Sequence, residues 1–432
     1  MRASFYTLGC KVNQYETQIL MQLFAAQGYD IVQFGDAADV CVINTCTVTD
    51  TGDRKNRQAL RRARRENPQG IIALTGCMPQ AFPEQSRLFS EADVVTGAYN
   101  RKGLLDAVAK RLATGERVVD IHPHKRGEEF ESMRADRFAQ HTRAFIKIED
   151  GCDRFCTYCI IPKARGPVRS KPLAQLRAEL AGLAGEGYRE AVLVGINLSS
   201  YGRDLGLRLI DAVRAASDTA GIERVRLGSL EPELLTREDM EEMSSLPKLC
   251  PQFHLSLQSG CDATLRRMNR QYDTAKYMDI VRDLRRSFRN CAVTTDIMVG
   301  FPQETEAEFL ESMAFFRSVG FARAHVFAYS AREGTPAAAL SGQVPQRVKA
   351  VRSKQMLEAA QQSMNDFLRF QSGLTEPVLF EMRNGEFAEG YTANYTFVRI
   401  KTPLDLQWKI LPVRLVGVTG EGCVGEIMEQ SS

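Results

Sequence analysis

The sequence predicts a multidomain α/β protein in which two α/β parts precede a small β-barrel. The chain has 432 residues, which exceeds the size of one ordinary hydrophobic core. Short β-branched runs alternate with helical patterns in the first 97 residues and again from Thr142, whereas only strand patterns follow Gln371. We therefore expect three domains, at 1–125, 142–370 and 371–432, with a linker at 126–141.

The N-terminal domain is expected to alternate strands and helices. Apolar residues at helical spacing predict a helix at Asn13–Gln27, and a second helix is expected at Gly103–Ala113. The charged stretch His122–Gln140 favours a linker. Short β-branched runs, which are typical of buried parallel strands, predict strands at Ser4–Leu8, Val40–Ile43 and Ile71–Leu74.

The central domain contains about six βα units, which predict a parallel barrel, open or closed. Helical patterns cover Leu173–Gly185 and Asp273–Ser287, and a long polar helix is expected at Gln346–Gln371. The expected barrel strands are Phe145–Ile148, Ala191–Gly195, Val225–Gly228, Phe253–Leu257, Val293–Val299 and Ala324–Tyr329.

The C-terminal segment predicts a small β-barrel of short strands. From Gln371 onward it carries five Lys or Arg against eight Asp or Glu, a net charge of −3, so bulk charge opposes RNA binding there. If this barrel binds RNA, stacking by residues such as Tyr391, Tyr395 and Phe397 must contribute. The expected strands are Val378–Met382, Thr396–Ile400, Pro412–Val418 and Gly425–Glu429.

Composition places the chain among soluble globular proteins, with 44% hydrophobic and 25% charged residues. No run of about 18 apolar residues predicts a membrane span, and the N-terminus lacks the apolar stretch of a signal peptide. We therefore expect a cytoplasmic protein with no membrane partner. Eleven cysteines, an odd number in a reducing compartment, favour metal binding over disulfides. The net charge of +3 permits a nucleic-acid partner without arguing for one.

Three cysteines lie close together in the chain, at Cys152, Cys156 and Cys159. Three thiolates at this spacing can hold one [4Fe–4S] cluster and leave one iron open for a small molecule. The alternative interpretations are a partial zinc site or chance clustering. Zinc sites usually have four protein ligands, and no fourth Cys or His lies nearby in the sequence, which disfavours zinc.

Three further cysteines each follow an expected strand, at Cys10, Cys46 and Cys77. The carboxyl ends of parallel strands meet at one edge of an α/β sheet, so these cysteines should converge there as a second metal site. The alternative is three buried core cysteines, which are common. A core cysteine is expected within a strand, as at Cys41, which favours the metal site.

Polar residues and glycines at the ends of the barrel strands predict a ligand pocket, because barrel enzymes place their sites there. Any one of these strand ends taken alone would more often be a loop or a helix cap. One of them, Gly300, permits close approach of a ligand. The candidate pocket residues at these ends are Gly195, Asn197, Ser229, Glu231, Gln258, Asp296 and Gly300, followed by the loop Tyr329–Pro336.

The stretch Asp53–Asn67, which begins seven residues after Cys46, is dense in basic side chains. It is either a solvated helix face or a phosphate-contacting helix beside the N-terminal cysteines. Its basic residues are Arg54, Lys55, Arg57, Arg61, Arg62, Arg64 and Arg65.

The chain resembles the methylthiotransferases, which are radical S-adenosylmethionine (SAM) enzymes, over nearly its whole length. The spacing of Cys152, Cys156 and Cys159, with Tyr158 before the last cysteine, is similar to the radical SAM signature. The other matching motifs are Leu8-Gly-Cys-Lys-Val-Asn-Gln-Tyr-Glu16, Asn44-Thr-Cys-Thr-Val-Thr49, Thr75-Gly-Cys77, Leu257-Gln-Ser-Gly260, Met268-Asn-Arg270 and Tyr329-Ser-Ala-Arg332.

This resemblance implies two [4Fe–4S] clusters, SAM as a cofactor and a C-terminal β-barrel of the kind called TRAM. It implies that Cys152, Cys156 and Cys159 hold the cluster that cleaves SAM. By the same resemblance, Cys10, Cys46 and Cys77 hold an auxiliary cluster that delivers sulfur. The adenine and ribose of SAM are expected against Tyr158 and the strand ends listed above. The implied reaction replaces an adenine C2–H with a methylthio group.

The motif that begins at Gly9, together with Gly390–Tyr395, resembles the branch that acts on N6-threonylcarbamoyladenosine in tRNA. The implied partners are the tRNA anticodon arm, an electron donor such as a flavodoxin or ferredoxin, and a sulfur donor. The alternatives are the same chemistry on isopentenyl-adenosine in tRNA or on a ribosomal-protein aspartate, or a non-catalytic metal-bearing RNA-binding protein.

Two residues depart from the family pattern. Gln303 stands where the family usually has glycine in Gly-Phe-Pro-Gly-Glu-Thr, which predicts an altered loop at the SAM pocket. Cys261 stands where a small polar residue is usual.

Overall fold

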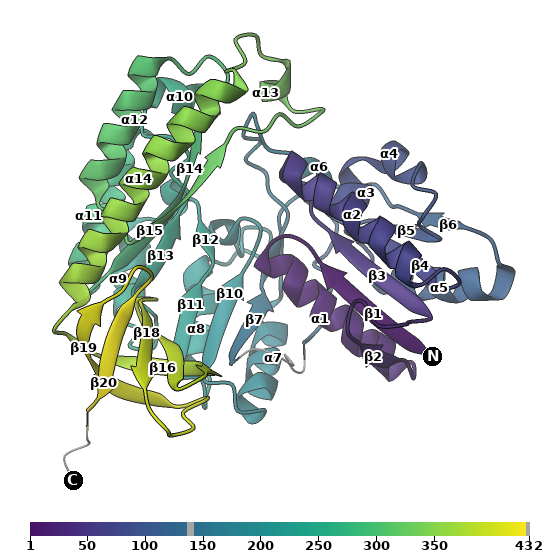
Figure 1. The fold of residues 1–432 in the computed structure, drawn as a ribbon, viewed down its shortest axis with the longest axis horizontal. Helices are drawn as coiled ribbons and strands as arrows, with labels where there is room; N and C mark the ends of the chain where they lie inside the picture. Colours follow the sequence, from purple (N-terminus) through teal and green to yellow (C-terminus); the bar gives the residue numbers. More distant parts are fainter. Residues whose placement is uncertain (136–141, 429–432) are drawn as a thin grey trace.

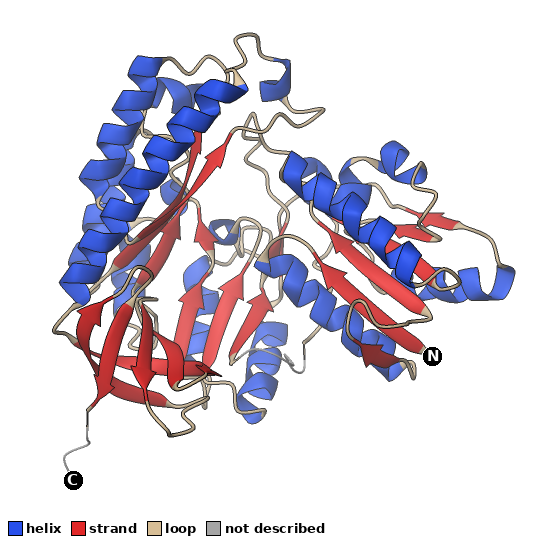
Figure 2. Cartoon of the chain, viewed as in Figure 1, coloured by secondary structure: helices blue, strands red, loops and turns tan. Residues whose placement is uncertain are grey.

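A computed structural model describes residues 1–135 and 142–428, apart from the side chains of Asp50 and Thr51. Figure 1 shows an N-terminal α/β part, a central part built around parallel strands, and a small C-terminal barrel packed below it. Figure 2 shows helices covering the sheets of the first two parts. The predicted fold class is therefore confirmed. The proposed domain boundaries stay predictions, and residues 136–141 of the expected linker lie outside the described residues.

The N-terminal part is a six-stranded parallel sheet in the order β2-β1-β3-β4-β5-β6. Helices α1 (Lys11–Ala26) and α5 (Gly103–Thr114) bury apolar residues against one face. Helices α2 (Asp50–Glu66) and α3 (Cys77–Ala81) cover the other, where the in-strand cysteine Cys41 lies in the core. The short helix α4 (Pro83–Arg87) follows α3. The strands are β1 (Arg2–Thr7), β2 (Asp30–Val32), β3 (Val40–Thr45), β4 (Ile71–Gly76), β5 (Val94–Thr96) and β6 (Val118–Asp120).

The central part is an open barrel of parallel strands in two sheets, β11-β10-β7 and β12-β13-β14-β15. Within the described residues, β7 pairs only with β10 and β15 only with β14, so the barrel is open between β7 and β15. Helix α1 packs against β7, and α14 packs along β15. The strands are β7 (Arg143–Lys147), β10 (Glu190–Val194), β11 (Arg224–Leu227), β12 (Ser229–Leu230), β13 (Gln252–Leu255), β14 (Ala292–Val299) and β15 (Arg323–Ala328).

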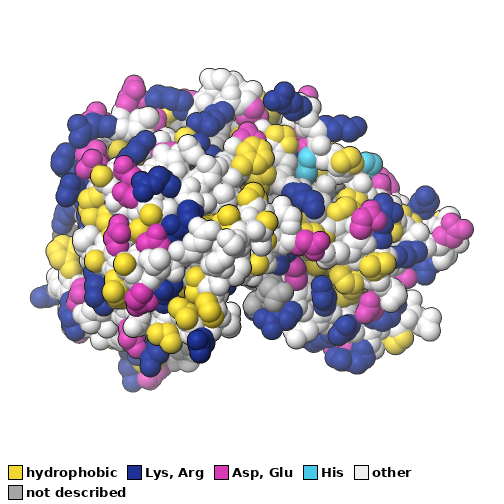
Figure 3. Space-filling model, turned by 90° about the horizontal axis from the view of Figure 1, so that it is seen from above, with side chains coloured by type: hydrophobic (Ala, Val, Ile, Leu, Met, Phe, Trp, Pro, Cys, Tyr) yellow, Lys and Arg dark blue, Asp and Glu magenta, His cyan; other side chains and the backbone are white. Residues whose placement is uncertain are grey.

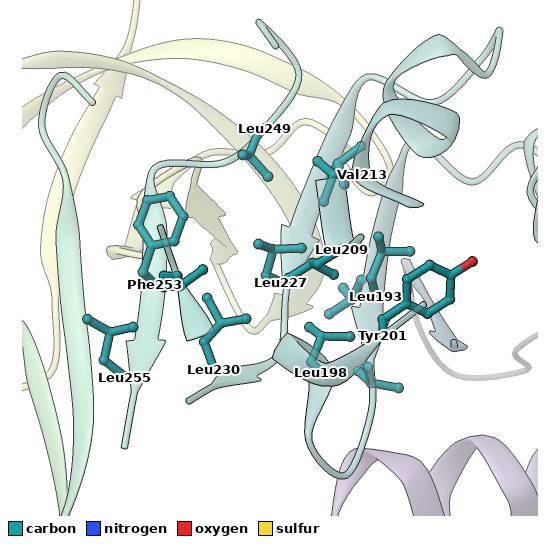
Figure 4. Packing of buried hydrophobic residues seen from close by; sticks show 14 of the residues in the cluster. Leu193, Leu198, Tyr201, Leu209, Val213, Leu227, Leu230, Leu249, Phe253 and Leu255 are labelled. Carbon is teal, nitrogen blue, oxygen red and sulfur yellow. The ribbon is translucent and has the colours of Figure 1, made fainter. Parts of the chain in front are cut away.

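Helices on the outer face of the barrel bury its apolar side. Figure 4 shows Leu193 and Leu227 from the strands packed with Leu209 and Val213 from α8. A small antiparallel pair, β8 (Glu149–Asp150) with β9 (Arg169–Ser170), and α6 (Ile161–Arg165) follow β7. The remaining helices are α7 (Leu173–Gly185), α8 (Leu209–Asp218), α9 (Arg237–Ser244), α10 (Asp262–Arg267), α11 (Thr274–Ser287), α12 (Glu306–Val319), α13 (Pro336–Ala339) and α14 (Gln346–Gln371).

The C-terminal part is a closed five-stranded barrel in the order β16-β17-β18-β20-β19. It packs against the central barrel through stacked side chains. The Tyr391 and Tyr395 rings lie 4.5 Å apart and nearly parallel, and the guanidinium of Arg226 lies 4.7 Å from the Tyr395 ring centroid. These tyrosines therefore hold two domains together, which differs from the base-stacking role considered for them. The strands are β16 (Thr375–Asn384), β17 (Phe387–Thr392), β18 (Phe397–Lys401), β19 (Ile410–Val418) and β20 (Cys423–Ile427).

Gln303 adopts a left-handed backbone conformation, with φ of +65°. Glycine adopts such a φ without steric cost, and other residues are uncommon there. The loop at Gln303 therefore keeps the backbone shape that glycine favours. Its side-chain amide Nε2 donates to the carbonyl of Ser341 at 3.3 Å. The other departure from the family pattern, Cys261, is buried at the start of α10.

A buried network of charged side chains joins the N-terminal part to the central barrel. Glu16 of α1 receives ion pairs from Arg165 at 2.6 Å, from Lys147 at 2.9 Å and from Arg101 at 2.6 Å. Lys147 also pairs with Asp150 at 2.7 Å. Burial alone raises the pKa of Glu16, but the three cations outweigh this and lower its pKa to about 2. The carboxylate is therefore charged and shared by both parts.

We predict that Glu16→Gln destabilises the protein by about 3–5 kcal/mol, because it leaves buried cations without their shared anion. Urea unfolding of the variant and the parent at pH 7 measures this. The matched control is Glu84→Gln, which removes a surface pair with Arg87 (side chains 86% and 52% exposed). That change should stay within about 0.5 kcal/mol. Equal effects of the two substitutions would contradict a clamping role for the network.

Candidate functional site

The three N-terminal cysteines converge at the carboxyl edge of the sheet, as the sequence predicts. Strands β1, β3 and β4 are neighbours. Cys10 caps α1 after β1, Cys46 directly follows β3, and Cys77 begins α3 directly after β4. The Cys77 thiol interacts electrostatically with both Cys46 and Cys10. The topology therefore brings together three thiols that are far apart in sequence.

Short-range packing fixes the two loops that carry Cys10 and Cys46. Gly9 has a φ of +112°, and a Cβ at this position would lie 2.8 Å from the Cys46 Cβ. Only glycine fits here without strain. The buried amide of Asn13 donates to the carbonyls of Leu8 at 2.7 Å and Thr45 at 3.0 Å. Asn13 therefore ties the Cys10 loop to the Cys46 loop.

The second triad lies in the loop between β8 and α6, beside the strand ends of the barrel. Arg270 donates to the Cys156 sulfur at 3.2 Å, and the Asn197 amide approaches the Cys152 sulfur at 3.7 Å. Electrostatic interactions join Cys159 to Cys156 and Cys152 to Cys159. The three sulfurs therefore share one small volume.

The chemistry of this donor set fits an iron–sulfur cluster. Burial raises the pKa of Cys152 and Cys159 to about 12, so the free thiols are neutral at pH 7. A bound metal centre would stabilise the thiolate forms instead. Beside Cys152, the Glu149 Oε1 and Asn197 Oδ1 atoms are buried without a hydrogen-bond partner among the described residues, which suits a polar ligand.

Within residues 1–135 and 142–428, no group of three His, Cys, Asp or Glu side chains is arranged to hold a single metal ion. In an iron–sulfur cluster each thiolate binds a different iron, so its cysteine sulfurs do not converge on one point. A zinc site needs such convergence.

A cavity of about 190 Å³ lies between the two cysteine loops. The central barrel contributes Tyr158, Cys159, Gln258 and Asp296, and the loop after Cys46 contributes Val48 and Thr49. Residues from both parts of the chain therefore line one space. Three candidate pocket residues, Tyr158, Gln258 and Asp296, line this cavity, and their contact with a ligand stays a prediction.

The other candidate pocket residues lie around this cavity without lining it. Gly195 and Asn197 contact Glu149, whose Oε2 accepts the Asn197 backbone N–H at 2.7 Å. Glu231 forms an ion pair with Arg270. Ser229 follows β11 after Gly228, as the sequence predicts, and begins the short strand β12.

Gly300 faces away from this cavity. A Cβ on Gly300 would lie 2.4 Å from the Lys349 side chain, so its close neighbour is α14. Its backbone N–H donates to the Glu304 carboxylate at 2.7 Å. Its role toward a ligand stays a prediction.

Arg165 and Arg270 are two buried residues to which the sequence analysis assigns no role. Arg165 donates from Nε to the Cys77 sulfur at 3.1 Å, and Arg270 donates to Cys156. Each triad thus has a buried guanidinium that donates to one of its sulfurs. Arg270 belongs to a quoted family motif, but nothing in its local sequence indicates a contact with a cysteine more than 100 residues away.

The basic stretch after Cys46 forms α2, and only part of its charge is available to a partner. Arg64 pairs with Asp93, and Arg62 pairs with Glu66 at 2.8 Å. Lys55, Arg57 and Arg65 are exposed and, among the described residues, have no ion-pair partner; Arg61 has only a 3.8 Å contact with Glu91. Figure 3 shows Lys and Arg mixed with Asp and Glu over the upper face, so any phosphate contact is local.

Comparison with known proteins shows the family to which the chain is related. Residues 2–97 match the family described as uncharacterized protein family UPF0004, and residues 146–316 match the radical SAM superfamily. A threonylcarbamoyladenosine tRNA methylthiotransferase from Bacillus subtilis is 37% identical, over 96% of this chain and 93% of its own. A tRNA-2-methylthio-N6-dimethylallyladenosine synthase from Pelotomaculum thermopropionicum is 33% identical, over 95% and 94%.

A solved structure of a radical SAM enzyme has a fold similar to most of this chain. The radical SAM methyltransferase TsrM from Kitasatospora setae aligns with a TM-score of 0.58 at 13% identity, over 78% of this chain and 77% of its own. At that identity the likeness concerns the fold alone. The relatives at 33–37% identity cover nearly the whole chain. The chain therefore belongs to the radical SAM tRNA methylthiotransferases, enzymes that use SAM and two [4Fe–4S] clusters.

Proposed function

We propose that this protein adds a methylthio group to C2 of N6-threonylcarbamoyladenosine next to the anticodon of tRNA. The observation that carries the proposal is the cavity of about 190 Å³ that both cysteine loops border. Relatives named for threonylcarbamoyladenosine, from Bacillus subtilis and Aquifex aeolicus, are 37% and 36% identical. A tRNA substrate implies a cytoplasmic location, and the chemistry requires an electron donor and a sulfur donor. Within the described residues, no helix has the length and apolarity needed to cross a membrane.

We propose that each of the two triads holds a different iron–sulfur cluster with its own role. Cys152, Cys156 and Cys159 would hold the cluster that binds SAM, and Cys10, Cys46 and Cys77 would hold the auxiliary cluster. When bound, these groups supply reductive cleavage of SAM and sulfur for transfer. The spacing of the central triad and its position at the barrel strand ends support the first assignment. Convergence at the sheet edge supports the second.

The chain's own residues would orient the reactants. Asn197 and Glu149 present unpaired polar atoms beside Cys152, where they can accept hydrogen bonds from an ammonium or hydroxyl group. Tyr158 and Asp296 line the cavity, with an aromatic ring for packing and a carboxylate for an N–H donor. Arg270 bridges Cys156 and Glu231 and holds the signature loop against the barrel.

The substrate assignment is tested on short anticodon stem-loop RNAs that differ only in the base next to the anticodon. Reconstituted enzyme with SAM and a reductant should add a methylthio group to N6-threonylcarbamoyladenosine, seen by mass spectrometry of the digested nucleosides. RNA with isopentenyl-adenosine should react much more slowly. Preference for the isopentenyl RNA would assign the protein to the sister branch. Deoxyadenosine release with neither RNA modified would point to another substrate, and no release at all to a binding protein.

Substitution of single cysteines should separate the two triads. Cys156→Ala should abolish formation of 5′-deoxyadenosine from SAM, because the cluster that binds SAM loses a ligand. Cys46→Ala should leave that cleavage largely intact and stop methylthio insertion.

Iron analysis should show about eight irons per parent chain and about four when Cys10, Cys46 and Cys77 are all alanine. Cys41→Ala, in the core of the same sheet, is the control and should keep the full iron content. Equal loss of deoxyadenosine in both single variants would refute the division.

Charge reversal on α2 should weaken tRNA binding. Arg57→Glu with Arg65→Glu removes two exposed cations from the helix that begins after Cys46. If both contact phosphates, the slope of log affinity against log salt should fall by about 1.4–1.8, and the affinity should fall with it. The control is Arg282→Glu with Arg286→Glu on the exposed face of α11. If both doubly substituted proteins bind tRNA like the parent with the same salt slope, α2 is a solvated face.

A further inference from the structure

Lys11 reaches from the N-terminal part over the inner surface of the open barrel. It is the first residue of α1 and directly follows Cys10. Helix α1 packs against β7, the strand that borders the opening of the barrel. The Lys11 side chain is exposed, and its Nζ lies 5.8 Å from the ring centroid of Phe145 on β7. The ammonium group therefore stands in a solvent-accessible space beside the barrel wall.

The opposite wall of this space carries a cluster of polar side chains. Asp296 of β14 lies directly across from His325 of β15 in the strand register. The His254 Nε2 is 3.3 Å from the Asp296 carboxylate, and the His254 and His325 rings lie 6.2 Å apart. Alternate β15 residues Ala324 and Val326 pack into the core, so Arg323, His325 and Phe327 face the barrel interior. Together with Asp296 and His254, these three side chains form the cluster that faces Lys11.

The charges in this space do not balance. Arg143 pairs with Glu381 at 2.7 Å, and Arg226 pairs with Glu190 at 2.7 Å. Asp296 also carries a carboxylate here, and among the described residues its ionic contact is with His254. Lys11 and Arg323 are exposed cations that, among the described residues, have neither a hydrogen bond nor an ion pair. Both interact electrostatically with His325, so both lie in its surroundings.

The same strands connect this cluster to the cavity between the cysteine loops. Asp296 and Phe327 line that cavity and also neighbour His325. A base held in the cavity could therefore extend a substituent along the inner face of β14 and β15. Such a substituent would meet a region that has two cations without anionic partners.

We propose that Lys11, together with Arg323 and His325, binds a carboxylate carried by the substituent on the target base. This inference rests on the proposed function, because the threonylcarbamoyl group bears one carboxylate. A carboxylate pairs with an ammonium or guanidinium through charge-assisted hydrogen bonds. An apolar substituent of similar length would leave these polar groups desolvated and unpaired, so the site would also select against it.

The test compares two stem-loop RNAs that differ in one functional group. One carries N6-threonylcarbamoyladenosine, and the other carries its threoninamide analogue, in which a neutral amide replaces the carboxylate. Affinity is measured by fluorescence anisotropy with the reconstituted enzyme. The parent should prefer the carboxylate RNA by about 10- to 100-fold, the usual effect of one hydrogen bond to a charged group. Lys11→Met should remove most of this preference by weakening only the carboxylate RNA, and Lys11→Arg should retain much of it.

Lys110→Met on the outer helix α5 is the matched control and should bind both RNAs like the parent. Iron content is measured for each protein, because Lys11 adjoins Cys10. If Lys11→Met loses iron, Arg323→Met supplies the same comparison from the opposite wall. Equal affinity of the parent for the two RNAs overturns the proposal, as does unchanged preference in both Met variants. If the parent binds the carboxylate RNA selectively but does not methylthiolate it, the proposed reaction fails while the anion site stands.

Discussion

The contact of Arg165 with Glu16, Asn13 and Cys77 is the constraint on which the rest of the site depends. Arg165 is fully buried and ends α6, six residues after Cys159. Its guanidinium donates to the Cys77 sulfur at 3.1 Å, to the Glu16 carboxylate at 2.6 Å and to the side-chain Oδ1 of Asn13 at 2.5 Å. Arg165, which follows the second triad, thus contacts two parts of the first triad's surroundings. It contacts Asn13 on α1, the helix that begins after Cys10, and it contacts Cys77 itself. The relative position of the two triads follows from this contact.

Apolar packing supports the same junction. Cys77, Ala81 and Phe82 of the N-terminal part pack with Ile160 and Ala164 of the central part in one buried cluster. Burying ions is costly, and a well-packed apolar interface is often at least as stable as a buried ion pair. We interpret the Arg165 network as a device for orientation, because guanidinium hydrogen bonds fix both distance and angle. The proposed reaction, which would use both cysteine triads across a cavity of about 190 Å³, would need such a fixed geometry.

The sequence predicts the fold class and the convergence of both triads because these depend on local rules. A cysteine directly after a β-branched run lies at the strand end whatever else the chain does, and neighbouring parallel strands share that edge. The missed elements are those with weak local signals. Strand β5 has only three residues, and β17 (Phe387–Thr392) contains Gly390, which weakens a strand pattern. Glu429 of the last expected strand lies outside the described residues.

The contacts that charged side chains make with residues distant in the sequence could not be predicted from the sequence. Arg165 and Arg270 are buried because each meets a carboxylate and a cysteine that are distant in sequence, and charged residues are ordinarily expected at the surface. For the tyrosines of the C-terminal barrel, the sequence suggested a surface for RNA, but the side chains make contacts within the protein. Tyr391 and Tyr395 have the composition of a base-stacking surface, yet they stack on each other and on arginines of the central barrel. Composition alone does not distinguish these uses.

The open side of the barrel gives the molecule one space shared by its first two parts. A closed barrel would fill its interior with its own side chains. Here the gap between β7 and β15 lets α1 present Lys11 to the interior while the Cys46 loop borders the cavity above. The element that positions the first triad therefore also supplies a charge to the barrel interior. Because both come from α1 and its preceding loop, substrate selection and sulfur transfer would depend on the same docking of the N-terminal part.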